Sequence, residues 1–308
     1  MKQIIDRFLR LSEQGKLRFD EPLAPYSSFK IGGPADVLAK PDTQKDLIDL
    51  LIYAIKREIP WFILGKGSNL LIGDKGIRGL VISMEGFNKI TRDDNYVSAF
   101  AGQSLKELCR FCMEEGLSGL EFACGIPGSV GGAVFMNAGA YEGEIKDVLY
   151  CSKCLTPTLK SLQSTNPILH LKKEAHMFSY RHSALQDRGL IHLSSVFKLS
   201  PAPRVDILKR MEELDQMRND KQPMDMPSAG SVFKRPPGHF TGKLVDDCGL
   251  RGFRIGGASI SNKHCGFIVN LGGATAKDVK DLIEHVQSTV YERFKVHLET
   301  EIRQVGEM

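Results

Sequence analysis

Two glycine-rich segments offer backbone amides to an anionic ligand. The first is Gly65-Lys66-Gly67-Ser68-Asn69, which lies between two short apolar runs that predict strands. Glycine lets a ligand approach the backbone closely, and successive N–H groups can cradle a phosphate. Leu70 stands where a G-x-G-x-x-G fingerprint has its third glycine, and no helix is predicted to follow, which argues against a Rossmann site. A tight turn without a ligand is the alternative.

The second segment is Gly125-Ile126-Pro127-Gly128-Ser129-Val130-Gly131-Gly132-Ala133. Its glycines are far above average usage, and its small residues predict the start of a helix. A helix start offers N–H donors and the positive end of a dipole to an anion. Pro127 stands where a nucleophile elbow has its first glycine, and the segment is no Walker A motif. Two such loops suit a diphosphate held from both sides, and a glycine-rich connector is the alternative.

Three further segments carry side chains that can do acid, base or anion chemistry. Ser231 and Lys234 lie on a predicted loop rich in proline and glycine. Arg181 ends Phe178-Ser-Tyr-Arg, whose alternation predicts a strand with Ser179 and Arg181 on one face. Glu299 and Glu301 share one face of a predicted C-terminal strand. Each has a plainer interpretation as a turn serine, a solvated arginine or a polar strand face.

The cysteines leave a metal site as an alternative only. Two C-x-x-C pairs, Cys109/Cys112 and Cys151/Cys154, have the ligand type of a zinc site, but they are farther apart than in a zinc ribbon. Cys112 also fits the apolar face of a predicted helix. His264 has no second ligand at metal-binding spacing, so we predict no metal. Seven cysteines without an export signal favour free thiols in a reducing cytoplasm.

Composition predicts an ordinary globular protein of two or three domains. The chain has 308 residues, of which 42% are hydrophobic and 25% charged, with a net charge of +4. That charge is too small and too dispersed to indicate nucleic-acid or membrane-surface binding. No run reaches the ~18 apolar residues of a membrane span, and the N-terminus predicts an amphipathic helix capped by Gly15 rather than a signal peptide. We therefore expect a cytoplasmic protein.

The elements that must position these residues alternate between helix and strand. Thr43 predicts the start of one helix, Ser104 with Glu107 a capping box for the next, and Thr275 the start of the last. Strands are predicted at 61–65, at 70–73, through the GLVISM run and at 96–101. A charged helix is predicted after residue 200, with Ile207, Met211 and Leu214 facing inward. This order indicates an α+β or α/β protein.

Seven motifs, taken together, resemble one enzyme family. They are FKIGGPAD (29–36), LGKGSNLL (64–71), GIPGSVGGAVFMNAGAY (125–141), FSYRHS (178–183), SAGSVFK (228–234), KHCGFIVN (263–270) and LETEIRQVG (298–306). Their types and order are similar to those of the UDP-N-acetylenolpyruvoylglucosamine reductase (UDP-N-acetylmuramate dehydrogenase) family. The similarity runs from about residue 20 to the C-terminus, and the combination is highly specific although each motif alone is not.

The resemblance implies an α+β, vanillyl-alcohol-oxidase-type (PCMH-type) FAD-binding fold of two α+β subdomains with a C-terminal α+β substrate-binding domain. The expected division is 1–90 with the N-terminal helix, 91–200, and 201–308. It implies non-covalent FAD, NADPH as co-substrate, and reduction of UDP-N-acetylglucosamine enolpyruvate to UDP-N-acetylmuramate for peptidoglycan synthesis. The expected protein is a cytoplasmic monomer that binds neither nucleic acid nor membrane.

The resemblance also assigns residues. It implies Arg181, Ser231 and Glu301 as catalytic residues, with Ser231 as proton donor. It implies Lys221, Lys234 and Tyr180 as substrate-binding residues. The implied FAD-binding residues are Gly65, Lys66, Gly67, Ser68, Asn69, Gly125, Ile126, Pro127, Gly128, Ser129, Gly132 and Ala133.

The chain departs from the long members of the family. Those carry a tyrosine-bearing loop between the equivalents of Arg181 and Ser231, whereas this interval is only about fifty residues long and has no tyrosine. The chain therefore resembles the short class, and we expect the 238–243 segment to replace the loop. Two other functions stay open: a flavin oxidase of the same fold, which the C-terminal motifs do not match, and a nucleotide-binding module without redox chemistry.

Overall fold

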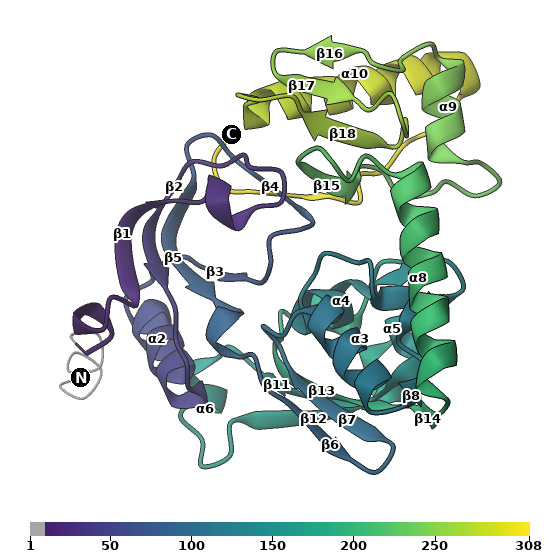
Figure 1. Ribbon diagram of the computed structural model, residues 1–308. Helices are drawn as coiled ribbons and strands as arrows, with labels where there is room; N and C mark the ends of the chain where they lie inside the picture. The colour runs from purple at the N-terminus through teal and green to yellow at the C-terminus, as the bar shows by residue number, and fades with distance from the viewer. Residues whose placement is uncertain (1–9) are drawn as a thin grey trace. The chain divides into compact units, whose positions relative to one another are not determined.

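The computed structural model describes residues 10–308, which divide into two compact units (Figure 1). Of these residues, unit 1 contains 10–19, 37–66 and 79–216, and unit 2 contains 20–36, 67–78 and 217–308. Each unit is thus assembled from three separate stretches of chain. The expected boundaries at residues 90 and 200 stay a prediction.

The N-terminal strands form a four-stranded sheet in the order β1-β2-β5-β3, with β3 parallel to β5. The strands are β1 (Leu17–Pro22), β2 (Pro34–Ala39), β5 (Ile77–Ser83) and β3 (Trp61–Leu64). Helix α2 (Gln44–Lys56) begins as predicted, because the Thr43 hydroxyl accepts a hydrogen bond from the amide of Asp46 at 3.1 Å. The predicted helix C-cap at Gly15 is also confirmed, with φ +65°, whereas the predicted helix over residues 1–9 lies outside the described residues.

Unit 1 contains a five-stranded antiparallel sheet in the order β12-β11-β13-β7-β6. Its strands are β12 (Ile168–Lys172), β11 (Leu149–Leu155), β13 (Ile191–Lys198), β7 (Tyr96–Phe100) and β6 (Ile90–Asp93). A one-residue register shift between β11 and β13 falls at Lys153/Cys154. Such a bulge changes which way the following side chains point.

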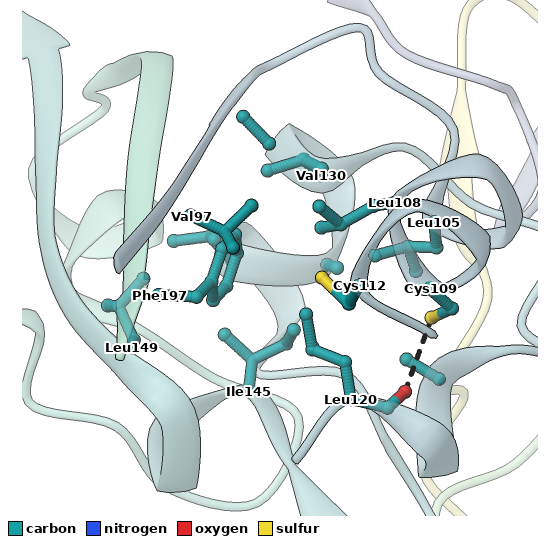
Figure 2. Packing of buried hydrophobic residues seen from close by; sticks show 14 of the residues in the cluster. Val97, Leu105, Leu108, Cys109, Cys112, Leu120, Val130, Ile145, Leu149 and Phe197 are labelled. Atoms are coloured by element: carbon teal, nitrogen blue, oxygen red, sulfur yellow. Dashed lines mark hydrogen bonds between the residues drawn. The ribbon is translucent and has the colours of Figure 1, made fainter. Parts of the chain in front are cut away.

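The apolar faces of α3 (Leu105–Glu114) and α4 (Val130–Met136) contribute to the main core of unit 1 (Figure 2). Leu105, Leu108 and Cys112 of α3 are buried, as the helical spacing predicted. The predicted capping box is wrong, because the Ser104 side chain makes no capping hydrogen bond and Glu107 instead accepts one from Gln103 Nε2 at 2.8 Å.

Shorter elements complete unit 1. They are η2 (Met84–Gly86), β8 (Leu117–Ser118), η3 (Glu121–Ala123), β9 (Gly139–Ala140), β10 (Gly143–Glu144), α5 (Ile145–Val148), α6 (Leu159–Leu162), η4 (Lys173–His176), α7 (Ala184–Asp187) and β14 (Ser200–Pro201). Helix α8 (Arg204–Lys221) runs from unit 1 into unit 2, with Ile207 and Leu214 buried and Met211 half-buried. This is the inward face that the sequence predicted.

Unit 2 is a small antiparallel sheet packed on one long helix. The sheet order is β15-β18-β17-β16, and α10 (Ala276–Phe294) packs against β16 and β17 (Figure 1). Its elements are η1 (Ala24–Tyr26), β4 (Leu70–Ile72), β15 (Ser228–Ser231), α9 (Thr241–Asp247), β16 (Arg254–Ile255), β17 (Ala258–Ile260), β18 (Phe267–Asn270), α10 and β19 (Arg303–Val305). The core joins Val279 and Leu282 of α10 to Phe29, Ile31 and Leu71 from the first quarter of the chain.

Two predictions about the end of the chain need correction. Ser231 lies at the end of strand β15, not in a loop. The predicted C-terminal strand is regular only over β19, and Glu299 and Glu301 precede it in irregular backbone. The helix predicted from Thr275 is confirmed with a full capping box to Asp278. None of the helices in the described part of the chain is long and apolar enough to cross a membrane.

Candidate functional site

The two glycine loops meet in unit 1. A Cβ atom on Gly65 would lie 2.7 Å from the Ser129 hydroxyl oxygen, closer than real side chains approach. Ser129 is the N-cap of α4 and accepts a hydrogen bond from the Gly132 amide at 3.3 Å. A side chain at residue 65 would therefore displace the Ser129 hydroxyl from its bond to Gly132. Residues from two separate predicted cofactor motifs are thus brought together.

The expectation that α4 offers its first amides to a ligand is wrong in this structure. The amide of Val130 donates to Gln103 O at 2.9 Å, and that of Gly131 donates to Ala101 O at 2.8 Å. The amide of Gly132 is the one bound by Ser129. The carbonyl groups that follow β7 thus take the donors that a helix N-terminus otherwise leaves open. Any contribution of α4 to anion binding comes from its dipole rather than from these three N–H groups.

Arg181 lies at the tip of a tight turn, which corrects the strand predicted over 178–181. Ser179 and His182 exchange two backbone hydrogen bonds of 3.1 and 3.2 Å, so Tyr180 and Arg181 are the two residues between them. Arg181 has φ +56°, a left-handed conformation that costs a non-glycine residue about 1–2 kcal/mol. A conformation of this kind persists only where the surroundings hold it, and it is frequent at functional sites.

Side chains hold this turn to the end of α4. Asn137 Nδ2 donates to Ser179 O at 3.0 Å and to Glu144 Oε2 at 2.9 Å, and Asn137 is fully buried. Gln186 Nε2 donates to Arg181 O at 3.2 Å. Arg181 Nη2 donates to Gly139 O at 3.2 Å, and its guanidinium lies 5.0 Å from the Tyr180 ring centroid. The 125–141 and 178–183 motifs are therefore held together by hydrogen bonds between them.

From Gly67 onward, the first glycine loop belongs to unit 2. Gly67 has φ +63°, and a Cβ there would lie 2.0 Å from Tyr26 O, so this position requires glycine. Asn69 Nδ2 donates to Glu301 O at 3.1 Å, and Asn69 O accepts the amide of Arg303 at 3.0 Å. Asn69, predicted as a cofactor residue, thus anchors the segment that carries Glu301. Lys66 and Ser68 flank Gly67, and Lys66 is exposed.

A bulge sets the direction of Ser231. Strand β15 pairs with β18 at Ser228↔Val269 and Ser231↔Phe267, with a register shift between the two pairs. Gly230 lies in this shift with φ +78°. Glycine at such a position is typical of a bulge that re-aims the next side chain. The amide of Val232 then donates to Gly266 O at 2.9 Å, which fixes the backbone just beyond Ser231.

Glu301 lies beside Ser231 in unit 2. The amide of Glu301 donates to Val232 O at 2.7 Å, and the amide of Lys234 donates to Glu299 O at 2.8 Å. The segments 231–234 and 299–302 therefore run side by side, with an antiparallel bridge between Phe233 and Thr300. Two of the three predicted catalytic residues thus lie on paired backbone segments.

Of the predicted substrate-binding residues, Lys221 and Tyr180 lie at exposed positions and Lys234 is half-buried. Lys234 Nζ forms an ion pair with Glu299 Oε2 at 3.1 Å. Lys221 is the last residue of α8, and Tyr180 is half exposed on the Arg181 turn. In the 238–243 segment, the exposed Phe240 lies with its ring centroid 3.8 Å from the guanidinium carbon of Arg235, just before α9. That segment stays a proposal for closure over the substrate.

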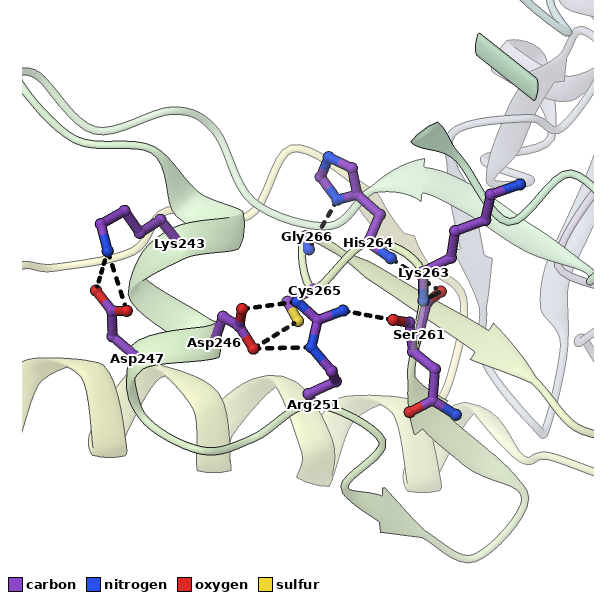
Figure 3. Close-up of polar contacts among 10 residues, drawn as sticks. Lys243, Asp246, Asp247, Arg251, Ser261, Lys263, His264, Cys265 and Gly266 are labelled. Carbon is purple, nitrogen blue, oxygen red and sulfur yellow. Dashed lines mark hydrogen bonds and ion pairs between the residues drawn. The ribbon is translucent and has the colours of Figure 1, made fainter. Parts of the chain in front are cut away.

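The KHCGF motif, whose His264 and Gly266 are labelled in Figure 3, supports the Ser231 backbone. His264 Nδ1 accepts a hydrogen bond from the Gly266 amide at 3.0 Å, and Gly266 is the residue whose carbonyl binds Val232. Burial lowers the pKa of His264, so its ring is neutral at neutral pH. On the other side of this turn, the Arg251 guanidinium binds both carboxylate oxygens of Asp246 at 2.9 and 2.6 Å and lowers the pKa of that carboxyl.

The cysteines of the two C-x-x-C pairs are free thiols of the core and its edge. Cys109 Sγ donates to Leu120 O at 3.2 Å (Figure 2), and burial raises the pKa of Cys112 and of Cys154 to about 12. Across residues 10–308, no group of three or more metal-ligating side chains is close enough to hold an ion. The structure thus offers no support for the zinc alternative.

The residues of the glycine loops fit a flavin dinucleotide. Gly65 and Gly132 are exposed next to Ser129, which caps α4. A Cβ atom at either position would cover the backbone there. Backbone without side chains lets a diphosphate approach closely.

Sequence comparison finds two family models along the chain. A model described as an FAD binding domain matches residues 35–158, and the C-terminal domain of UDP-N-acetylenolpyruvoylglucosamine reductase matches residues 222–305. A protein of Caldanaerobacter subterraneus subsp. tengcongensis with this reductase name is 46% identical over 304 residues, covering 99% of this chain and 98% of that protein. One from Clostridium perfringens strain SM101 is 43% identical over 309 residues, covering 99% of each.

A solved structure agrees with these matches. The crystal structure of UDP-N-acetylenolpyruvylglucosamine reductase from Thermus caldophilus superposes with a TM-score of 0.78 at 37% identity, covering 94% of this chain and 97% of that one. The predicted α+β FAD-binding fold with a C-terminal domain is thereby confirmed.

Sequence reasoning missed the residues that hold the site. Asn137, Gln186 and Gly266 lie inside or next to the recognised motifs, yet no role was predicted for them. The signal that was available is the asparagine of MNAGAY, a residue type that tolerates the left-handed conformation and can bind backbone on both sides. In the structure Asn137 has φ +43°.

Proposed function

The chain belongs to the UDP-N-acetylenolpyruvoylglucosamine reductase family, and from this premise we propose how its residues share the reaction. It is an FAD-containing oxidoreductase that reduces the enolpyruvyl group of UDP-N-acetylglucosamine enolpyruvate to give UDP-N-acetylmuramate for peptidoglycan synthesis, with NADPH as co-substrate. Bound FAD supplies the chemistry that carries reducing equivalents from NADPH to the vinyl group.

Arg181 is the proposed carboxylate ligand. Reduction of the vinyl carbon places extra negative charge on the substrate carboxylate, and a guanidinium binds a carboxylate with two parallel hydrogen bonds. Donors fixed before the charge develops are often the largest catalytic contribution. The side chains that hold the Arg181 turn, and the left-handed backbone they maintain, support this role.

Ser231 is the proposed proton donor, through its Oγ–H, to the carbon next to the carboxylate. A hydroxyl is a weak acid in water but an adequate one beside an enolate, and a positioned general acid contributes about 10²–10⁴-fold to the rate. Glu301 is proposed to stabilise the same enolate by a hydrogen bond. The observation that carries both assignments is the bond of 2.7 Å between Glu301 N and Val232 O, which pairs the two segments.

The remaining assignments are proposed by the same resemblance. Gly65, Lys66, Gly67, Ser68 and Asn69 with the 125–133 loop hold FAD without a covalent bond, and Lys221, Lys234 and Tyr180 bind the sugar nucleotide. The protein is proposed to act as a monomer in the cytoplasm. A flavin oxidase of the same fold is disfavoured, because the reductase-specific model matches 222–305.

Anaerobic absorbance spectroscopy of Ser231→Ala tests the proton donor. We expect NADPH to bleach the flavin at the wild-type rate, and the enolpyruvyl nucleotide to restore it about 10²–10⁴ times more slowly. Ser228→Ala, on the same strand, is the matched control and should reoxidise normally. An equal fall of both half-reactions in Ser231→Ala would contradict the donor assignment, and a protein that stays colourless with FAD would contradict the whole function.

A further inference from the structure

A hydrogen-bonded chain of four buried polar side chains links β13 and β11 of the five-stranded sheet to η4 in unit 1. His192 Nε2 lies 2.7 Å from Ser195 Oγ, Ser195 Oγ lies 2.7 Å from Ser152 Oγ, and Ser152 Oγ lies 2.9 Å from His176 Nε2. His176 Nδ1 in turn lies 3.0 Å from Lys172 O. All four residues are buried. Burying a polar group costs free energy unless it is hydrogen-bonded, so four such groups in one place need an explanation.

The bulge in the sheet makes the chain possible. Ser152 of β11 and Ser195 of β13 are directly opposite each other, which explains the contact between their hydroxyls. His192 is three residues before Ser195, and in a regular strand these two side chains would point to opposite faces. The register shift at Lys153/Cys154 inserts one extra residue, so that His192 and Ser195 share a face.

The protons of the chain can be assigned by elimination. Lys172 O only accepts, so His176 Nδ1 carries a proton and His176 Nε2 accepts one from Ser152. Ser195 must then donate to Ser152, and His192 Nε2–H must donate to Ser195. Burial lowers the pKa of His176 and lowers that of His192 to about 3, so both rings are neutral, as this assignment requires.

The assignment also accounts for one exception in the hydrogen bonding. His192 Nδ1 is buried and has no hydrogen-bond partner among the residues described. In this tautomer Nδ1 is a bare acceptor, and an unsatisfied acceptor is tolerated more readily than an unsatisfied N–H. The chain therefore runs in one direction, from His192 to the Lys172 carbonyl, with every proton used.

The hydrogen-bonded chain of side chains ends at His176, close in sequence to the Arg181 turn. The His176 ring stacks on the Phe178 ring with centroids 5.0 Å apart and planes at 13°. Phe178 directly precedes Ser179, whose backbone closes the turn with His182. Asn137 holds the same Ser179 from the other side, at its carbonyl. Besides the Asn137 and Gln186 side chains, the turn thus has a further support, a ring whose orientation the polar chain fixes.

We propose that His176, oriented by Ser152 and Ser195, is a positioning residue for Arg181. This inference rests on the proposed function, in which Arg181 binds the substrate carboxylate. Histidine suits the position because it combines a flat ring for stacking with a donor on one side and an acceptor on the other. Phenylalanine retains only the ring, and glutamine retains only hydrogen bonding.

Half-reaction kinetics of Ser152→Ala and His176→Phe test the proposal, with Cys109→Ala as the control. Each variant removes one or more buried hydrogen-bonding groups in unit 1, but Cys109 is not part of the chain. We expect both chain variants to slow flavin reoxidation by the enolpyruvyl nucleotide about tenfold to a hundredfold, since small displacements of a positioned group have effects of this size. Flavin reduction by NADPH should stay within about twofold of wild type.

A double variant separates positioning from general damage. If His176 acts through Arg181, then Ser152→Ala should slow reoxidation no further in an Arg181→Lys background. The proposal is overturned if the rate losses of Ser152→Ala and Arg181→Lys multiply in the double variant. It is also overturned if flavin reduction and flavin reoxidation slow together, or if Ser152→Ala and His176→Phe behave like Cys109→Ala. Ser152→Ala alone decides the matter if His176→Phe does not fold. If the flavin of Arg181→Lys were reoxidised at the wild-type rate, the proposed function of Arg181 would be refuted instead.

Discussion

The Arg181 turn in unit 1 and the Ser231–Glu301 segments in unit 2 are held by different kinds of bonds. The Arg181 turn depends on side chains, since Asn137 and Gln186 bind its carbonyl groups and His176 stacks beside it. The Ser231 and Glu301 segments depend on backbone pairing, through Val232 N to Gly266 O and Glu301 N to Val232 O. A turn that leaves few backbone groups to pair must rely on side chains for its geometry.

This difference predicts which substitutions each region tolerates. Backbone pairing survives a change of side chain, so unit 2 should be sensitive chiefly where glycine is required. A turn held by side chains can lose its geometry through a single truncation. The predictions below test this contrast, from the largest expected effect to the smallest.

Asn137→Ala should lower the free energy of unfolding by about 3 kcal/mol. The buried amide binds Ser179 O, Glu144 and the Lys146 amide, and each lost bond contributes about 1 kcal/mol. Alanine is also disfavoured at φ +43°. Urea unfolding of the FAD-bound protein measures this loss.

Asn137→Gly is the matched control for this substitution. Glycine accepts the left-handed backbone but lacks the amide, so it should recover about 1 kcal/mol of stability. Both variants should slow flavin reoxidation, because both release the turn. Normal reoxidation in either one would show that Asn137 does not hold Arg181 in place.

Gly230→Ala should lower the free energy of unfolding by about 1–2 kcal/mol. No non-neighbouring atom of the described residues 10–308 lies within 4 Å of the added Cβ, so the effect is backbone strain at φ +78° alone. Lys234→Ala, four residues later, should change stability by less than about 1 kcal/mol, because its ion pair is exposed and its backbone bond to Glu299 persists. Thermal unfolding compares the two, and a larger loss in Lys234→Ala would contradict backbone control of this region.

The smallest predicted effect is on stability in acid. His192 has a pKa of about 3 in the folded protein, against 6.5 for an ordinary histidine. As the pH falls below 6.5 the unfolded chain binds a proton that the folded chain does not, so stability present above that pH is lost on acidification. Between about pH 7 and pH 5.5, wild type should lose about 1 kcal/mol more than His192→Gln. Equal losses in urea unfolding would show that His192 titrates normally.

Local signals made part of this structure predictable. Thr43 and Thr275 are each followed three residues later by an aspartate, and both begin helices, because a cap is satisfied within one turn. Gly65 and the 125–133 loop could be assigned to one site from their composition and from the family resemblance. At the two helix starts, the residues that decide the structure are close together in sequence.

The predictions that were wrong concern positions where distant residues decide the structure. Phe178 and Tyr180 alternate as in a strand, but the turn is decided by Asn137, which lies 42 residues from Ser179. At Ser104 the local pattern predicts a capping box, yet backbone bonds with the 128–130 segment occupy this helix start. Distant residues override the local preference at these positions, and the spacing of neighbouring residues does not indicate which distant residues these are.

The core of unit 2 has a consequence for how the protein is made. Phe29, whose carbonyl accepts a hydrogen bond from Asn270 Nδ2 at 3.1 Å, is separated from it by 241 positions. Synthesis at about 5–20 residues per second leaves an interval on the order of 10–50 s between the two. Phe29, Ile31 and Leu71 belong to the same buried cluster as the apolar side chains of α10, which is among the last segments to emerge. A nascent chain therefore exposes these apolar side chains until translation is nearly complete, and a chaperone that binds them in that interval would protect the chain from aggregation.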